Sequence, residues 1–371
     1  MNPPFGETKT SDSLPLIDLY RELGATFDPD VGLSRVPAHY GSPAEEYARL
    51  RQGCGLVDGS GVARIDVDGE DGRRFINGMV TCDVQSLVPG GGVYGFFTDR
   101  LGHVLADVVV RMAEKNLWLE LPASCAESIV HHLEKYIIAD RVELKRADDC
   151  LALTLLGARA PDLLAELAPG EELPQAPWAH GEVGLLGRQL RISTHQGRGL
   201  PSLTLWPAAA EAPSLVRELL AADTGVDLGP VGHEAVEMVR LESGIPRFGQ
   251  DFDSQNLPQE TGLDEAVSYD KGCYLGQEIV ARLHFRGQAS RLMRGVMLDT
   301  DHLPPVGVAL LADGREAGRL TSVGQSPQLD RVIGLSILQR RATEPGTRVV
   351  VEGTEREGGV VELPFAEQVE R

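Results

Sequence analysis

The chain has 371 residues, enough for two or three domains of ordinary size. Its 35 basic residues stand against 55 acidic ones, which gives a formal net charge of −20. Because nucleic-acid phosphates are bound by clustered lysines and arginines, this charge opposes direct binding to DNA or RNA.

The compartment is predicted from simple sequence features. We find no stretch approaching about 18 consecutive apolar residues, and the first residues, M-N-P-P-F-G-E-T, contain no apolar core of a signal peptide. We therefore expect a cytoplasmic protein without membrane association. Scattered cysteines without a C-x-x-C pattern are typical of a reducing compartment and argue against a metal site built by this chain alone. The five cysteines are Cys54, Cys82, Cys125, Cys150 and Cys273.

The N-terminal residues, 1–35, are rich in Pro, Gly and polar residues and predict a flexible arm, with one helical turn near 14–23. Residues 43–52 predict a helix. Ser42 is suited to its N-cap and Pro43 to its first position.

Residues 36–149 predict a first α+β unit. Alternating polarity indicates strands at 64–68, 93–98, 103–112, 117–121 and 141–145. Helical patterns cover 71–79 and the residues after Ser124, where Ser124 and Glu127 form a capping box. The order β-α-β-β-β-α-β is that of a ferredoxin-like unit with one extra strand.

Residues 150–287 repeat this order and predict a second α+β unit. Strands are expected at 151–156, 184–186, 188–194 and 202–206, and helices up to 167 and over 212–222. A further helix over 233–242 is followed by a polar loop at 251–261.

Residues 288–371 change in character. Short strands of period two recur between turn residues, at 292–298, 308–311, 316–322, 332–338, 348–351 and 359–362. This pattern is typical of a small antiparallel β-barrel. The predicted fold class is therefore α+β, with two ferredoxin-like units and a C-terminal barrel.

The most informative stretch is K-G-C-Y-L-G-Q-E-I-V-A-R at 271–282. Its glycines indicate a tight turn, and a helix is predicted from Gln277 onward. Helix amides and the charge of Lys271 would favour the thiolate of Cys273, which makes Cys273 a candidate reactive thiol. The alternative is a buried and inert cysteine.

K-G-C-Y-L-G-Q-E resembles the signature of the YgfZ family of folate-binding proteins, K-G-C-[FY]-x-G-Q-E. That family is related to the aminomethyltransferase, or T-protein, of the glycine cleavage system. The resemblance implies a three-domain fold whose two α+β units surround a cavity for tetrahydrofolate. It also implies that Cys273 and Lys271 are catalytic, and that the partners are iron–sulfur client or assembly proteins.

The same resemblance points to two carboxylates. R-L-E-S-G, which contains Glu242, resembles R-L-E-A-G of T-proteins and implies a contact between Glu242 and the pterin. Asp107 matches the second aspartate of G-G-I-L-D-D-L-I-V, whereas Ala106 replaces the first. The alternatives are a solvated glutamate at a helix end and an aspartate on an exposed sheet face.

Further residues are predicted to contact the folate. Arg291 or Arg294 corresponds to an arginine that the family directs toward folate, although either could be a solvated linker residue. Tyr94 could stack on a folate ring or pack in the core. Within the signature, Tyr274 and Gln277 are assigned to the same site.

Two functions follow from the resemblance. The first is a tetrahydrofolate-binding protein that supports assembly or repair of iron–sulfur enzymes, including enzymes that modify tRNA. The second is a folate-dependent aminomethyltransferase or demethylase, which would need an acid–base carboxylate at the folate nitrogen. Ala106 and the cysteine-containing signature count against the second function.

Overall fold

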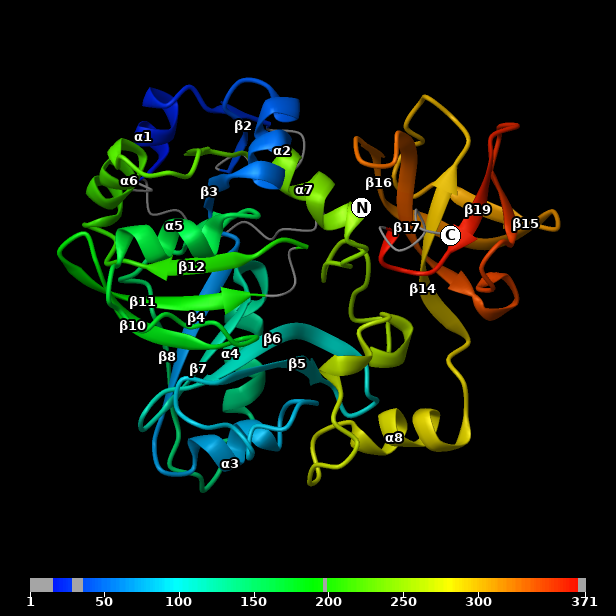
Figure 1. Cartoon of the computed structure of the whole chain (residues 1–371). Helices are drawn as coiled ribbons and strands as arrows, with labels where there is room; N and C mark the ends of the chain where they lie inside the picture. Colours follow the sequence, from blue (N-terminus) through cyan, green and yellow to red (C-terminus); the bar gives the residue numbers. More distant parts are fainter. Residues whose placement is uncertain (1–15, 29–35, 196–198, 366–371) are drawn as a thin grey trace. The chain divides into compact units, whose positions relative to one another are not determined.

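The computed structural model describes residues 16–28, 36–195 and 199–365 (Figure 1). The chain divides into two compact units. The first unit contains Met1–Asn77, Asp83–Tyr94 and Val108–Glu237, and the second contains Gly78–Cys82, Gly95–Asp107 and Met238–Arg371. Within the described ranges, every helix is too short or too polar to cross a bilayer.

A five-stranded sheet has the strand order β5-β6-β7-β4-β8. Strand β4 lies antiparallel between β7 and β8. This is the predicted β-α-β-β-β-α-β order with β5 as the extra strand at one edge. The elements are β4 (Val62–Asp68), α3 (Gly72–Asn77), β5 (Gly92–Thr98), β6 (Val104–Met112), β7 (Leu117–Pro122), α4 (Ala126–Glu134) and β8 (Glu143–Arg146).

The predicted capping box at Ser124 is wrong. Residues Ala123–Cys125 form a 3-10 turn, and α4 begins only after it, with Cys125 at the N-cap and no side-chain cap. Because the turn takes up Ser124, Glu127 lies in the first turn of α4, where it favours the helix through the dipole.

A second sheet repeats the element order of the first. Its strand order is β10-β11-β12-β9-β3-β13. The repeated elements are β9 (Leu153–Leu156), α5 (Ala160–Leu167), β10 (His180–Leu185), β11 (Arg188–His195), β12 (Ser202–Trp206), α6 (Ala212–Ala221) and β13 (Leu228–Pro230).

Two strands of the second sheet, β3 and β13, were not predicted. Strand β3 (Cys54–Asp58) lies between β9 and β13, antiparallel to the former and parallel to the latter. The chain enters β3 from α2 (Pro43–Gln52), whose first turn is capped as predicted, because Ser42 Oγ accepts from the amide of Glu45 at 3.4 Å. The earlier elements are α1 (Ile17–Glu22), β1 (Thr26–Phe27) and β2 (Pro37–His39).

One apolar core joins the second sheet to its helices. It includes Leu19 of α1, Leu56 of β3, Leu155 of β9, Leu163 of α5 and Leu215 of α6, all of them buried. Burial of one such side chain contributes about 2 kcal/mol. The core explains why β3, although distant in sequence, joins this sheet.

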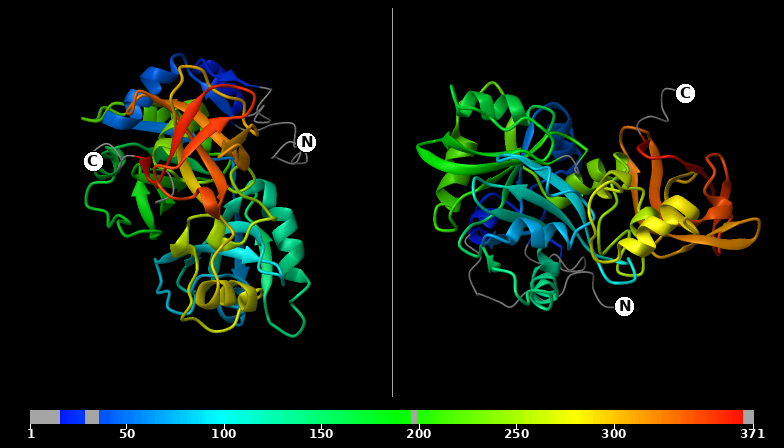
Figure 2. Two further views of the ribbon diagram at one scale, coloured as in Figure 1. Left: turned by 90° about the vertical axis from the view of Figure 1, so that its right-hand side faces the viewer. Right: turned by 90° about the horizontal axis from the view of Figure 1, so that it is seen from below.

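The C-terminal strands close into a six-stranded antiparallel barrel, coloured yellow to red in Figure 2. Val296, Leu320 and Val349 are among the side chains that fill its interior. The strands are β14 (Arg291–Leu298), β15 (Ala309–Ala312), β16 (Arg315–Ser326), β17 (Arg331–Gln339), β18 (Arg348–Val351) and β19 (Glu357–Val361).

Helix α7 (His233–Glu242) has the predicted bounds, and helix α8 (Gln277–Arg286) begins at the predicted residue. Two short 3-10 turns, Pro258–Glu260 and Asp264–Ala266, lie between them. The α+β fold with its C-terminal barrel is thus confirmed. The domain boundaries at 35/36, 149/150 and 287/288 stay a prediction, and part of the N-terminal arm lies outside the described residues.

Candidate functional site

Cys273 lies in the turn that leads into α8, and its side chain is exposed. Gly276 adopts a φ of 83° at the N-cap, and a Cβ there would collide with the carbonyl oxygen of Asp99. The turn is fixed on both sides of Leu275, whose carbonyl accepts from Thr98 Oγ1 at 2.6 Å and whose amide donates to Gly78 O at 3.0 Å. A fixed turn therefore presents the thiol to solvent, and the alternative of a buried cysteine is wrong.

Lys271 is held by backbone carbonyls. Its ammonium donates to Val80 O at 2.7 Å and to Cys82 O at 2.6 Å. The same ammonium lies 5.2 Å from the centroid of the Tyr274 ring. Two of its three N–H donors thus anchor residues 80–82 beside the turn. A catalytic role for Lys271 stays a prediction.

Tyr274 carries a buried hydroxyl. The residue is 7% exposed, and burial raises the pKa of its phenol. Among the residues that the structure describes, the hydroxyl has no hydrogen-bond partner. Buried hydroxyls normally have one, so this group is suited to a water or a ligand atom. Gln277, the first residue of α8, is half-buried in the same segment.

Glu242 ends α7 and is buried rather than solvated. Its carboxylate accepts from Ser326 Oγ at 2.5 Å and from the amide of Gln328 at 3.1 Å. The glutamate therefore ties the end of α7 to the end of β16. Whether it also pairs with a pterin stays a prediction.

Ala106 and Asp107 lie on opposite faces of β6, because successive side chains of a strand alternate. Ala106 is fully buried, whereas Asp107 is half-buried. Asp107 therefore does not occupy the place of the acidic residue that Ala106 replaces. Its contact with folate stays a prediction.

The two candidate arginines differ in their surroundings. Arg291 forms an ion pair with the buried Glu260 at 3.0 Å and donates to Gln255 O at 3.2 Å. Within the described part of the chain, Arg294 donates to two backbone carbonyls, Thr343 O at 2.8 Å and Met293 O at 3.1 Å, and forms no ion pair with a carboxylate. Arg291 is thus committed to a carboxylate, while the charge of Arg294 is not neutralised by such a pair.

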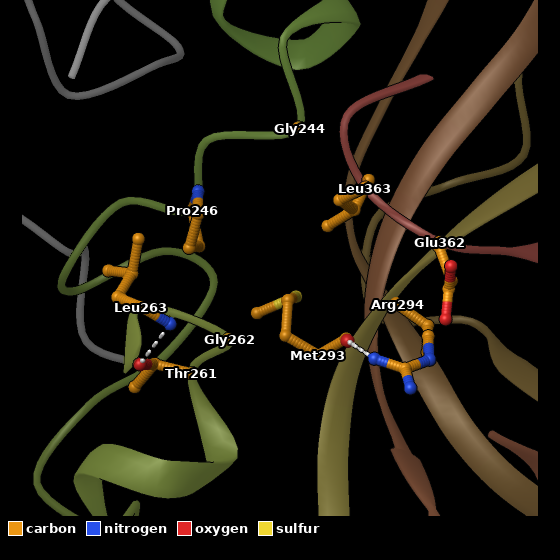
Figure 3. Close-up of a pocket in the computed structure, with 9 residues that line it drawn as sticks. All are labelled: Gly244, Pro246, Thr261, Gly262, Leu263, Met293, Arg294, Glu362 and Leu363. Carbon is orange, nitrogen blue, oxygen red and sulfur yellow. Dashed lines mark hydrogen bonds between the residues drawn. The ribbon is translucent and has the colours of Figure 1, made fainter. Parts of the chain in front are cut away.

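Arg294 also lines a pocket of about 200 Å³ (Figure 3). Most of its lining residues are apolar or glycine, and the carboxylate of Glu362 lies at the same side as the guanidinium. The remaining lining residues are Gly244, Pro246, Thr261, Gly262, Leu263, Met293 and Leu363. The pocket can hold a small group with an apolar body and a polar end.

Tyr94 belongs to the first unit and stacks on Trp178, with ring centroids 5.4 Å apart and an interplanar angle of 15°. Both residues are half-buried, so Tyr94 is not a core residue. Trp178 was not predicted as a site residue. The only signal was a lone tryptophan in a proline-containing segment.

The structure thus brings Lys271, Cys273, Tyr274 and Gln277 together in one segment of the second unit. Glu242 and Arg291 are engaged by neighbouring side chains instead. Arg294, another predicted site residue, lines the pocket of about 200 Å³.

Comparisons with known proteins find matches over most of the chain. Residues 16–271 match the model of the GCVT N-terminal domain, and residues 291–366 match that of the glycine cleavage T-protein C-terminal barrel domain. An aminomethyltransferase of Bacillus velezensis is 28% identical over 356 residues, which cover 95% of this chain and 97% of that protein. An aminomethyltransferase of Bacillus subtilis is 26% identical, with coverages of 95% and 98%.

A solved structure shares the fold. The crystal structure of the glycine cleavage system aminomethyltransferase T from Bartonella henselae matches with a TM-score of 0.84 at 24% identity. The match covers 97% of this chain and 99% of that chain.

Proposed function

Since this chain belongs to the GCVT family of the glycine cleavage T-protein, we propose that it binds tetrahydrofolate, the ligand of that family. Both matched domains are present, and the similarity to aminomethyltransferases extends over 95% of the chain. The proposed role of the folate-bound protein is to support assembly or repair of iron–sulfur enzymes, including tRNA-modifying enzymes.

The observation that carries this role is the exposed thiol of Cys273. It lies in the K-G-C-Y-L-G-Q-E turn, which resembles the YgfZ signature. Glycine at 276 and the hydrogen bonds of Leu275 fix that turn, so the thiol is held in a defined place. A fixed and exposed cysteine can reach a client protein or a cluster, whereas a buried one cannot.

Aminomethyl transfer is the second candidate function. The names of the relatives support it more directly than they support the first, because the relatives are aminomethyltransferases. They are, however, only 26–28% identical. Ala106 also stands where the resembling T-protein stretch has an aspartate, and Asp107 faces the other side of the strand. If the first aspartate of that stretch supplies the acid–base group at the folate nitrogen, this chain lacks that group.

Calorimetric titration of tetrahydrofolate, without oxygen, tests the shared part of both functions. We expect binding by the wild type and, within about twofold, by Cys273→Ser, because an alcohol is nearly the same size as the thiol. Absence of binding by the wild type contradicts both functions.

Two activity assays then separate the candidates. If the first is right, Cys273→Ser fails to restore iron–sulfur enzyme activity in cells that lack the protein, while Cys150→Ser restores it. Cys150 is a matched control because it is also a free cysteine but half-buried. Formation of methylene-tetrahydrofolate and ammonia from an aminomethyl donor, unaffected by Cys273→Ser, would favour the second candidate.

A further inference from the structure

Three aromatic rings meet near the end of α8. The rings of Tyr269 and His284 are stacked, with centroids 3.6 Å apart and an interplanar angle of 15°. The Phe285 ring packs edge-on against both, at 4.8 Å from His284 and 6.0 Å from Tyr269. All three residues belong to the second unit. We refer to them as the aromatic cluster.

The aromatic cluster is held in place but is open to solvent. Gln259 Nε2 donates to the hydroxyl of Tyr269 at 3.2 Å and to the carbonyl of Val280, in α8, at 2.7 Å. This amide therefore ties Tyr269 to the helix that carries the other two rings. Phe285 is nevertheless 68% exposed, and His284 is exposed as well. Core packing thus does not account for the Phe285 ring.

Two arginines accompany the exposed ring. With 3.6 residues per turn, Arg282, Phe285 and Arg286 lie on one face of α8. Both arginines are exposed, and within the described ranges neither forms an ion pair. Glu278 is the acidic residue of this face and lies one turn before Arg282, toward the start of the helix. Since the whole chain has a formal charge of −20, two unpaired arginines on one face are a local exception.

Exposed aromatic rings beside arginines are the composition of a protein interface, because these residue types are enriched in interface cores. The positive charge fits an acidic segment of a partner. Repulsion by the rest of this acidic chain is screened beyond a Debye length of about 8 Å at physiological salt, so a short segment senses mainly the two arginines. A nucleic acid would instead need a longer row of cations along its phosphates.

We propose that the aromatic cluster, with Arg282 and Arg286, docks an acidic segment of the client protein, and that Phe285 packs against an apolar side chain of that segment. This inference rests on the proposed function, in which the client is an iron–sulfur protein or assembly factor. Cys273 lies four residues before α8, and the ten residues of this helix span about 15 Å. An interface of ordinary size, about 800 Å² on each partner, covers that distance. A client docked on this face therefore comes within reach of the thiol.

Restoration of iron–sulfur enzyme activity in cells that lack the protein tests the docking surface on the full chain. Arg282→Glu and Arg286→Glu should each restore at least about fivefold less activity than the wild type, because a reversed charge repels the acidic segment. Arg282→Lys keeps the charge and should stay within about twofold of the wild type. Phe285→Ser removes the aromatic contact and should also lose at least about fivefold.

Matched controls lie in the barrel. Arg315 of β16 is an exposed arginine that forms no ion pair with the described residues, so Arg315→Glu makes the same change of charge elsewhere. Val306 is 61% exposed, so Val306→Ser removes an exposed apolar side chain of the same unit. Both controls should restore activity like the wild type. Equal losses in Arg315→Glu and Arg282→Glu would overturn the proposal.

A purely structural role of the arginines would give a different result. Arg286 lies in the last turn of α8, where a positive charge also favours the helix through its dipole. If the residues only stabilised the helix, their variants would have lower melting temperatures and weaker folate binding. We expect the melting temperature of Arg282→Glu to be unchanged and its tetrahydrofolate affinity to stay within about twofold. Loss of restoration that is matched by loss of folding would overturn the proposal.

The chemistry of the partner is read out by crosslinking in cells. Phe285→p-benzoylphenylalanine should form a crosslink to a protein segment rich in aspartate and glutamate, and the additional change Arg282→Glu should abolish it. The same amino acid at position 306 is the control and should not form that crosslink. A crosslink to a segment without acidic residues, or one that persists in the presence of Arg282→Glu, overturns the proposal.

Fluorescence anisotropy with a short, labelled single-stranded oligonucleotide tests the other class of partner. Wild type and Arg282→Glu should not differ in their affinity for it. Binding by the wild type that Arg282→Glu weakens about tenfold would assign the surface to nucleic acid and overturn the docking of a protein.

The outcomes also separate this proposal from the function on which it rests. If the wild type restores iron–sulfur enzyme activity and Arg282→Glu, Arg286→Glu and Phe285→Ser restore it equally, the docking surface alone is overturned. If the wild type itself restores no activity, the proposed function fails and the docking surface with it.

Discussion

Glu120 accepts two hydrogen bonds from the guanidinium of Arg111, at 2.5 Å and 3.1 Å, and both side chains are buried. His195 Nε2 lies 2.5 Å from the same carboxylate. Because Arg111 also donates to Trp178 O at 2.6 Å, the buried pair helps to hold Trp178 and should matter for stability.

We expect Glu120→Gln to lower the free energy of unfolding by about 3–5 kcal/mol, because the variant leaves the buried charge of Arg111 without its counterion. Urea denaturation followed by circular dichroism measures the change. Glu182→Gln is the matched control, since Glu182 pairs with Arg191 at 2.9 Å with a side chain that is 55% exposed. Its cost should stay below about 1 kcal/mol. Equal costs in the two variants would contradict a special role of the buried pair.

The same carboxylate predicts a pH dependence. Burial alone would raise the pKa of Glu120, but Arg111 and then His195 outweigh burial and hold the pKa well below its usual value. A carboxyl whose pKa is lower in the folded state contributes its full stability above the unfolded pKa, about 4.3, and loses it as the pH falls below that value.

Unfolding free energies measured from pH 6 to pH 3 should therefore fall more steeply in the wild type than in Glu120→Gln. One carboxyl gives a difference in slope of at most about 1.4 kcal/mol per pH unit below pH 4. Parallel curves for the two proteins would show that Glu120 has an ordinary pKa.

Individual helices and strands could be predicted because the residues that indicate each of them lie close together in the sequence. Ser42 and Pro43 mark the start of α2, and the run from Gln277 gives α8 its first residue. The alternating strands of the barrel were found for the same reason. Fold class follows from the order of such elements, which is why it was predicted correctly.

Contacts between residues far apart in the sequence could not be predicted, because no short sequence pattern indicates them. The pairing of β3 with β13 joins Cys54 to Leu228, and short runs such as C-G-L-V-D do not indicate their partner. Likewise, the Lys271 ammonium reaches the carbonyl of Val80, and Trp178 reaches the ring of Tyr94. Sequence alone identified Lys271 and Tyr94 as candidates, but their neighbours required the folded chain.

Cys273 should be the first cysteine to react with iodoacetamide in the native protein. It is exposed, whereas Cys54 is fully buried and burial raises the pKa of the Cys54 thiol to about 12. Mass spectrometry of peptides after short labelling at pH 7.5 should find at least tenfold more modification at Cys273 than at Cys54. Labelling in urea, where both thiols are accessible, is the control and should remove most of this difference.

Gly276→Ala should destabilise the turn that carries Cys273. The new Cβ would collide with Asp99 O, and the φ of 83° is unfavourable for alanine. We expect a loss of about 2–3 kcal/mol in the free energy of unfolding, and faster amide exchange in α8. Gly272→Ala, one residue before the cysteine, is the matched control, because a Cβ there meets nothing within 4 Å. A neutral Gly276→Ala variant would show that the turn adapts.

Substitution of Arg291 should change the stability of the protein, whereas substitution of Arg294 should change its affinity for folate. Arg291 neutralises the buried Glu260, so Arg291→Met should cost about 1–3 kcal/mol in stability while changing folate affinity by less than twofold. Arg294 lines the pocket of about 200 Å³ and forms no ion pair with a carboxylate of the described residues, so Arg294→Met should weaken folate binding by at least fivefold. Calorimetric titration and urea denaturation of both variants measure the two effects. The reverse pattern would assign folate to Arg291, and its pair with Glu260 would then have to open on binding.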